Sequence, residues 1–181
     1  MKSSLILLVV NLIWGSFQIN KQESFVSYTG YHPFHKWTGV SYEVELDTEC
    51  TLVSTNCDAI FTIPLISFNS GNSNRDSNMI YHLNAFKYPN VVIHFKKINI
   101  PKIFDNTDIL KIEGQVNFHN IKRIQRIPIH ISNSDNFTNL TSEFYIDLEE
   151  FNIKPPSLLM IPTDNKIKIN VNIKGFFNDN Q

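Results

Sequence analysis

The sequence predicts an all-β fold: a single antiparallel β-barrel of eight strands, with one short helix and a C-terminal flap loop. The 181 residues include 24 Ile and 14 Phe but only two Ala, and β-branched and aromatic side chains favour strands over helices. Short segments in which apolar and polar residues alternate recur from Phe25 onward, separated by Asn, Asp, Gly, Ser and Pro. These observations predict one β-domain with a single core.

The first 17 residues predict a secretory signal peptide. Lys2 precedes an apolar run over residues 5–14, and two small residues, Gly15 and Ser16, follow it. A basic start, a short apolar core and small residues behind it are typical of cleaved export signals, and the run is too short to span a membrane. We therefore expect residues 18–181 to form the mature domain, located in the periplasm or secreted. The alternative is an uncleaved anchor helix.

The strands are expected in order along the chain, beginning with one around Phe25 to Thr29. The clearest segment, residues 166–173, is apolar on one face and wholly polar on the other. The apolar faces of the other six segments comprise Val40, Tyr42, Val44 and Leu46; Phe61, Ile63 and Leu65; Val91, Ile93 and Phe95; Leu110, Ile112, Val116 and Phe118; Ile127, Ile129 and Ile131; and Phe144, Ile146 and Leu148.

Two segments break the alternation. Between Asn74 and about Phe86, three apolar residues at helical spacing, Met79, Ile80 and Leu83, predict the short helix. Residues 151–162 form a long apolar connection near the C-terminus, which we expect to pack as a flap on the mouth of the barrel.

Cys50 and Cys57 are the two cysteines of the chain, and they flank a predicted turn between two strands. Export permits a disulfide, and closing so short a loop would stabilise the fold by about 2–3 kcal/mol in the chain-entropy model. Two free thiols are the alternative.

Eight strands with one apolar face each must bury those faces against one another, and closure into a barrel also removes the exposed edges. A two-sheet sandwich is the competing solution. A barrel of eight strands is just wide enough to be filled by side chains or to hold one small ligand, so an unfilled apolar interior would bind an apolar molecule. An outer-membrane barrel has the opposite polarity, and alternation alone does not separate the two.

Three segments resemble the YceI-like domains, a family of secreted lipocalin-like barrels associated with polyisoprenoids and other long-chain lipids. Residues 68–79, FNSGNSNRDSNM, with residues 86–95, FKYPNVVIHF, are similar to the family's "S-x-x-(S/T)-G-N-x-x-RD" and "(K/R)-Y-P-x-(I/V)-x-F" runs. Residues 112–123 resemble the family's second hairpin, with Asn120 where Gly is usual, and residues 151–159 supply a third match. The matches occur in the family's order and cover most of the mature chain.

The resemblance implies an exported, soluble carrier or sequestering protein that holds a long-chain apolar molecule, a polyisoprenoid or another lipid, inside the barrel. The alternatives are an outer-membrane barrel and a secreted scaffold barrel with a fully packed core. The residues expected to line the ligand site from the barrel interior, the helix and the flap are Phe25, Val44, Phe61, Ile63, Met79, Leu83, Phe95, Ile112, Val116, Ile129, Phe144, Ile146, Leu158, Leu159, Met160, Ile169 and Val171.

Two pairs in the matched runs are expected to have structural roles. Asp76 at the start of the helix would cap free backbone amides, while Arg75 would pair with a carboxylate and hold the helix across one end of the barrel. Contact of Arg75 with a lipid head group is the alternative. Tyr88 and Pro89 would fix the entry into the next strand, because Pro restricts its own φ and favours an extended residue before it.

No catalytic or metal-ligating constellation is expected. Residues 71–75 nearly match a nucleophile elbow, but Arg75 replaces its second Gly, and His32 and His35 offer a metal only two ligands. The formal net charge of −1 gives no electrostatic reason to bind nucleic acid. We thus expect no enzyme activity and no cofactor besides the bound lipid; the partners would be this ligand, transiently a membrane, and at most a second copy in a homodimer.

Overall fold

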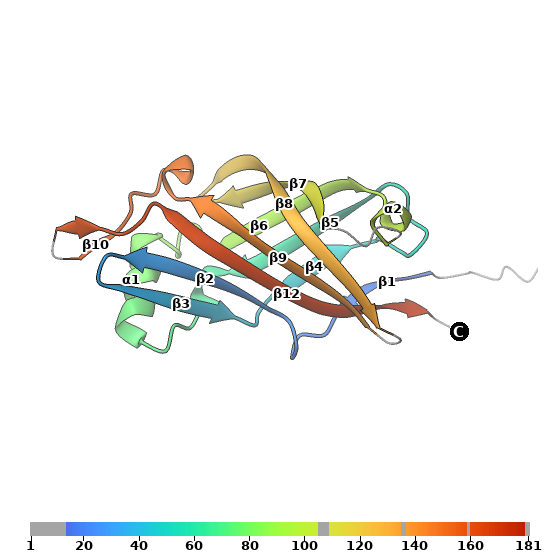
Figure 1. The fold of residues 1–181 in the computed structure, drawn as a ribbon, viewed down its shortest axis with the longest axis horizontal. Helices are drawn as coiled ribbons and strands as arrows, with labels where there is room; N and C mark the ends of the chain where they lie inside the picture. Colours follow the sequence, from blue (N-terminus) through green and yellow to red (C-terminus); the bar gives the residue numbers. More distant parts are fainter. Residues whose placement is uncertain (1–13, 105–108, 135–136, 159, 180–181) are drawn as a thin grey trace, which may run out of the picture.

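A ten-stranded antiparallel sheet curls around one apolar interior (Figure 1). This computed structural model describes residues 14–104, 109–134, 137–158 and 160–179. The strands of the chain are β1 (Trp14–Ile19), β2 (Phe25–His32), β3 (His35–Ser41), β4 (Glu45–Thr48), β5 (Cys57–Pro64), β6 (Asn90–Ile98), β7 (Leu110–Phe118), β8 (Ile121–Ser134), β9 (Phe137–Asp147), β10 (Ser157–Leu158), β11 (Ile161–Pro162) and β12 (Lys166–Asp179). The helices are α1 (Ser73–His82) and α2 (Ile100–Phe104), with 3₁₀ turns η1 (Leu65–Ser67) and η2 (Glu149–Phe151).

The sheet runs in the order β3–β2–β12–β9–β8–β7–β6–β5–β4, and β1 also pairs with β12. The predicted alternation holds along β12, where Ile169 and Val171 belong to the apolar interior while Lys168 lies on the outer face and pairs with Glu143 of β9 at 2.9 Å. β10 and β11 form a separate two-stranded hairpin. The all-β antiparallel fold is therefore confirmed, with more strands than the eight predicted.

The strand predicted over residues 40–46 is in fact divided between two strands, β3 and β4, which form the two opposite edges of the sheet. The Ser41 hydroxyl lies 2.6 Å from that of Ser67 and accepts a hydrogen bond from the Glu43 amide, so the chain turns between β3 and β4. Because β3 and β4 are not paired with each other, the barrel is open along this seam. The seam is bridged near one end, where the backbones of Val40 and Asn69 exchange two hydrogen bonds of 2.9 Å.

β1 extends the fold toward the predicted signal peptide. Phe17, the last residue of that predicted segment, is buried in the core, and its ring meets that of Phe177 edge-on at 5.1 Å. The folded domain therefore includes Phe17. The signal peptide itself stays a prediction, and residues 1–13 lie outside the described residues.

The predicted helix is present but shorter. Helix α1 begins after Asn72, whose side chain accepts a hydrogen bond from the Arg75 amide at 3.1 Å, and ends at His82, because Asn84 takes a left-handed φ of 47°. Phe86, the predicted end of the helix, is 89% exposed in the connection to β6. Within the described ranges no helix has the length and apolar character needed to cross a membrane.

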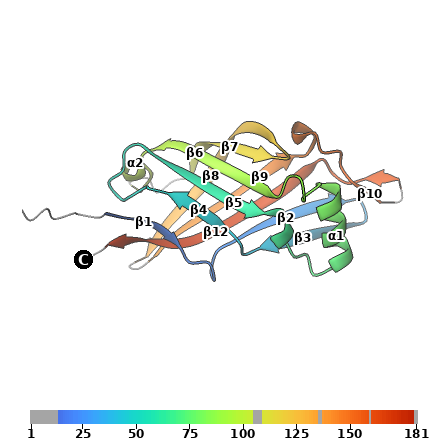
Figure 2. The same cartoon turned by 180° about the vertical axis from the view of Figure 1, so that it is seen from behind.

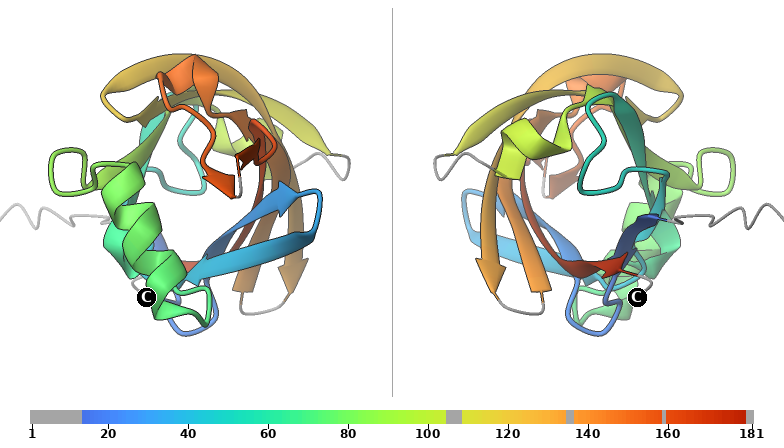
Figure 3. Two further views of the ribbon diagram at one scale, coloured as in Figure 1. Left: turned by 90° about the vertical axis from the view of Figure 1, so that its left-hand side faces the viewer. Right: turned by 90° about the vertical axis from the view of Figure 1, so that its right-hand side faces the viewer.

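The two ends of the curled sheet differ. At one end, shown facing the viewer in the left panel of Figure 3, lie α1, the turn between β2 and β3, and the β10–β11 hairpin. At the other end lie α2, β1 and the connection between β4 and β5 (Figure 2), where a disulfide joins Cys50 and Cys57 with their Cα atoms 5.4 Å apart. We call these the α1 end and the α2 end.

Candidate functional site

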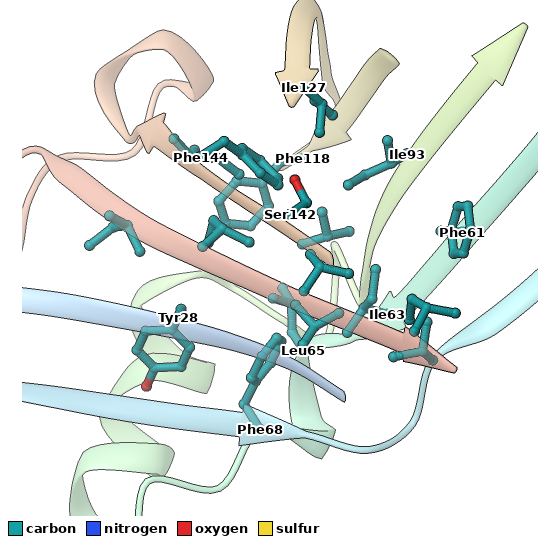
Figure 4. Close-up of a pocket in the computed structure, with 18 of the residues that line it drawn as sticks. Tyr28, Phe61, Ile63, Leu65, Phe68, Ile93, Phe118, Ile127, Ser142 and Phe144 are labelled. Atoms are coloured by element: carbon teal, nitrogen blue, oxygen red, sulfur yellow. The ribbon is translucent and has the colours of Figure 1, made fainter. Parts of the chain in front are cut away.

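A cavity of about 940 Å³ occupies the interior of the curled sheet. Its wall is formed mainly by Ile, Phe, Leu and Val side chains, which point inward from β5, β6, β8, β9 and β12 (Figure 4). This volume is in the upper part of the range of small-molecule sites. The interior is therefore apolar and not fully packed.

Twelve of the seventeen predicted ligand-site residues line this cavity. They come from strands on all sides of the interior and from the end of α1, because side chains two residues apart on a strand share a face. The twelve are Val44, Phe61, Ile63, Met79, Leu83, Phe95, Ile112, Ile129, Phe144, Ile146, Ile169 and Val171.

The other five are not among the described residues that line the cavity. Phe25 faces outward and packs against Tyr42 with ring centroids 6.2 Å apart, because Val26 takes the inward position opposite Val171. Val116 points inward but is 0% exposed and fully covered by its core neighbours.

The flap also differs from the expectation. Met160 is 97% exposed at the tip of the β10–β11 hairpin, where its left-handed φ of 64° belongs to the tight turn between the two strands. Leu158 lies in β10, but its side chain, like all of Leu159, lies outside the described residues. The flap contributes a different set of wall residues, Lys154, Pro155, Pro156 and Ser157, and Thr163 directly after it also lines the wall.

Several wall residues were not predicted. Apart from Thr48 of β4 and Thr141 and Ser142 of β9, the polar ones gather at the α1 end. They come from β2, from β3, from α1 and its N-cap, and from the segments flanking the β10–β11 hairpin. They include Tyr28, His32, His35, Trp37, Asn72, Asn74, Arg75, Asn78, Tyr81, His82 and Lys154. One sequence signal could have revealed the β2 residues: Tyr28, Gly30 and His32 alternate with Ser27 and Thr29, as expected for one face of a strand. The signal is weak, because that face is not apolar.

The α1 end is the mouth of the cavity. All wall residues that are exposed to solvent belong to it, among them His35 of β3, Asn78 and Tyr81 of α1, and Lys154. At the α2 end the described wall is largely apolar and none of its residues is exposed; the ring of Phe177 is there in edge-on contact with Phe17 and with Phe104 at 5.6 Å. Among the described residues, the exposed part of the cavity wall is therefore polar and lies at the α1 end.

Two glycines allow large rings to lie in the wall near the mouth. Gly39 pairs with Tyr28 and Gly30 pairs with Trp37 across β2 and β3, and a Cβ atom at either glycine would overlap the opposite ring. The missing side chains therefore set where these two aromatic rings lie.

Tyr28 is protonated at neutral pH. Burial, and secondarily the nearby Asp76 carboxylate, raise the pKa of Tyr28 to about 12. Its hydroxyl has no hydrogen-bond partner among the described residues. Tyr28 is accordingly a neutral polar group of the wall near the mouth.

The Arg75–Asp76 pair differs in part from the structural role expected for it. Both Asp76 carboxylate oxygens accept a hydrogen bond from the Ser70 amide, at 3.1 and 3.2 Å, so Asp76 fixes the loop before α1. No carboxylate lies within ion-pair distance of Arg75 in the part of the chain that the structure describes. Instead of holding the helix through an ion pair, the half-buried Arg75 lines the mouth.

Tyr88 and Pro89 directly precede β6, as expected. The Pro89 carbonyl accepts a hydrogen bond from the Leu65 amide at 2.7 Å, and the Tyr88 ring meets the His119 ring edge-on at 4.3 Å. Both residues join the strand entry to neighbouring segments rather than to the cavity.

His32 and His35 lie with ring centroids 5.5 Å apart, but His32 is held by the flap through a 3.2 Å contact between its Nε2 and the Ile161 carbonyl. A carbonyl only accepts, so His32 Nε2 carries the proton and donates here. The described ranges contain no group of three or more His, Cys, Asp or Glu residues placed to hold a metal ion.

Solved structures share this fold. BcnA of Burkholderia cenocepacia matches with a TM-score of 0.71 at 12% identity, over 87% of this chain and 99% of that one. A domain from Saccharophagus degradans, described as polyisoprenoid binding and implicated in plant cell wall breakdown, matches with a TM-score of 0.69 at 10% identity, over 92% and 99%. A YceI protein of Campylobacter jejuni matches with a TM-score of 0.57 at 15% identity, over 73% and 80%.

No curated protein matches by sequence. The model of the YceI-like domain, however, matches residues 17–175, from the core residue Phe17 of β1 to Gly175 in β12. The match spans both the strands that form the cavity and the helix at its mouth. The chain therefore belongs to the YceI-like domain family.

Proposed function

We propose that this protein is an exported carrier or sequestering protein that holds a long-chain apolar molecule, an isoprenoid or another lipid, in the cavity of its curled sheet. The observation that carries the proposal is the apolar cavity of about 940 Å³, whose exposed wall residues in the described part of the chain are polar and lie at the α1 end. The description of the Saccharophagus degradans domain as polyisoprenoid binding supports the ligand class. The ligand is bound without chemical change and without a cofactor.

Burial of the chain supplies the affinity. Each methylene group transferred from water into the cavity contributes about 0.8 kcal/mol, so a long chain needs no strong polar contact to be held. Because the packed rings of Phe17, Phe104 and Phe177 shield the α2 end while the exposed wall residues lie at the α1 end, the chain enters from the α1 end with its apolar terminus first.

Two competing functions fit less well. An outer-membrane barrel carries apolar residues outside and polar ones inside, whereas here the outer faces of β7 and β8 carry the exposed charges of Glu113, Lys122 and Arg126. A scaffold barrel with a packed core does not leave a cavity of about 940 Å³.

The disulfide between Cys50 and Cys57 supports export, because such bonds persist mainly in oxidising compartments. The buried position of Phe17 adds a requirement: signal peptidase must cleave before Phe17 for the exported protein to keep this core residue. N-terminal sequencing of the exported protein checks the cleavage position. A chain that begins at Gln18 or later would contradict cleavage before Phe17.

The binding proposal is tested on protein purified under native conditions from its own host. Native mass spectrometry and lipid extraction are expected to reveal a co-purifying long-chain lipid, and a fluorescent prenyl probe is expected to bind the delipidated protein. The absence of both would reject the proposal.

A matched pair of variants on β8 locates the binding site. Ile129→Glu places a charge in the cavity wall and is expected to abolish binding of the prenyl probe, whereas Ile124→Glu, at a 64% exposed position, is expected to leave it unchanged. Circular dichroism shows whether each variant is folded. Full binding by a folded Ile129→Glu variant would place the site elsewhere.

A further inference from the structure

The charged side chains in the cavity wall all have the same sign. In the described part of the wall these are Arg75 of α1 and Lys154 before β10, joined by the imidazoles of His32, His35 and His82, and neither Asp nor Glu lines it. All five lie at the α1 end, where the cavity opens. The mouth therefore presents cationic and hydrogen-bonding groups above an apolar pocket.

The guanidinium of Arg75 forms no ion pair with any described residue. The Asp76 carboxylate beside it is held by the Ser70 amide. The helix start does not depend on the side chain either, because the Asn72 cap binds the Arg75 amide. A half-buried guanidinium offers five donors in a planar fork that fits phosphate and carboxylate groups.

The elements that carry these groups are held together. The Nε2 atom of His82 in α1 donates to the Lys154 carbonyl at 2.7 Å, and that of His32 in β2 donates to the Ile161 carbonyl at 3.2 Å. Helix, flap and β2–β3 turn thus form one connected rim. A rim fixed in this way presents its donors without first having to be ordered.

The geometry points to a subsite for an anionic head group at the α1 end, so that the ligand is an amphiphile with a phosphate or carboxylate group on a long apolar chain. This inference rests on the proposed function and narrows its ligand class. The head lies between Arg75 and Lys154, and the chain extends toward the α2 end. The described wall at the α2 end carries no charged side chain, which favours this orientation.

The inference is tested with probes that share a chain and differ in the head: geranylgeraniol against geranylgeranyl monophosphate, and hexadecanol against palmitate. At low ionic strength and pH 7, at least one anionic probe is expected to bind the delipidated protein at least tenfold more tightly than its alcohol. The phosphate arm and the carboxylate arm distinguish a phosphorylated ligand from a fatty acid.

Three variants assign the preference to the rim. Arg75→Gln and Lys154→Gln are each expected to weaken binding of the preferred anionic probe at least fivefold more than binding of its alcohol. Lys122→Gln, on the exposed outer face of β8, is the matched control and is expected to leave both affinities unchanged.

Equal affinity for acids and alcohols, or a selectivity that Arg75→Gln and Lys154→Gln leave intact, would overturn the anionic subsite while the carrier function stands. Binding of none of the four probes would instead reject the carrier function together with the subsite. Raising the salt concentration gives a second readout, because it should weaken the anionic probe selectively.

Discussion

Gly39 leaves space on β3 for the ring of Tyr28, and Gly39→Ala is expected to destabilise the protein. The added methyl group would overlap the Tyr28 ring, so the ring or the strand must shift, at a cost of about 1–3 kcal/mol. Urea unfolding measures the loss, and Lys36→Ala, at an exposed position of the same strand, is the control. Equal stability of Gly39→Ala and the parent would show that the ring is not confined.

Asp58 makes the stability of the protein depend on pH. The Lys97 amide donates to its carboxylate at 3.0 Å and His94 Nε2 lies 2.8 Å away, and these hydrogen bonds hold the pKa of Asp58 below its usual value. A carboxyl whose folded pKa is lowered stabilises the fold above its unfolded pKa of about 4, and this contribution disappears as the pH falls through the folded pKa.

We therefore expect the parent protein to be more stable than Asp58→Asn at pH 7, with the difference shrinking below about pH 4. Urea unfolding of both proteins between pH 3 and pH 7 measures it. A difference that stays constant over this range would show that the carboxylate form of Asp58 does not stabilise the fold.

At the residue scale, alternation predicted much of the cavity wall but not its polar mouth. Ile112 and Ile129 followed directly from the period of two. In β2, however, the prediction was wrong by one residue: Phe25 was expected to face the interior, but Val26 does. His35 and Trp37 were missed because a polar or amphipathic side chain that faces inward gives no apolar signal.

The connection between β4 and β5 is the element that depends on the disulfide. Cys50 is 3% exposed and lines the α2 end of the cavity, and its carbonyl accepts a hydrogen bond from the Phe17 amide at 3.3 Å. Replacing both cysteines by Ala is expected to lower the free energy of unfolding by about 2–3 kcal/mol, because the short loop is no longer closed in the unfolded chain.

Urea unfolding with and without a reductant measures this effect. The reductant should destabilise the parent by a similar amount and leave the double Ala variant unchanged. If the reductant destabilises both proteins equally, or neither of them, the bond between Cys50 and Cys57 does not supply the stabilisation.

At the element scale, long strands with one polar face were predictable, and elements set by distant contacts were not. β7, β9 and β12 appear near their predicted positions because their alternation is local information. The turn that separates β3 from β4 depends on the hydrogen bond between Ser41 and Ser67, 26 residues apart in the chain, and no local pattern reveals it.

For the whole molecule, closure of the barrel depends on more than strand pairing. β3 and β4 leave a seam in the sheet, which Asn69 bridges near α1. At the other end β1 packs beside β4, and the Phe17 amide donates to the carbonyl of Cys50 in the connection after β4. Composition and alternation predicted an apolar interior but not whether it was packed, because a filled core and a cavity need the same inward faces.

If the cavity holds a chain as proposed, the α2 end limits the length of that chain, and Ala59→Phe is expected to shorten the limit. Ala59 lies on β5 near the disulfide and lines the wall, so a larger side chain there occupies the deep part of the cavity and leaves the mouth unchanged. Native mass spectrometry with prenyl alcohols of increasing length should show that the variant loses the longest chains first and keeps the shorter ones. Ile60→Phe, on the outer face of the same strand, should keep the parent's length profile. A uniform loss of affinity for all lengths in Ala59→Phe would mean that the chain does not extend to the α2 end.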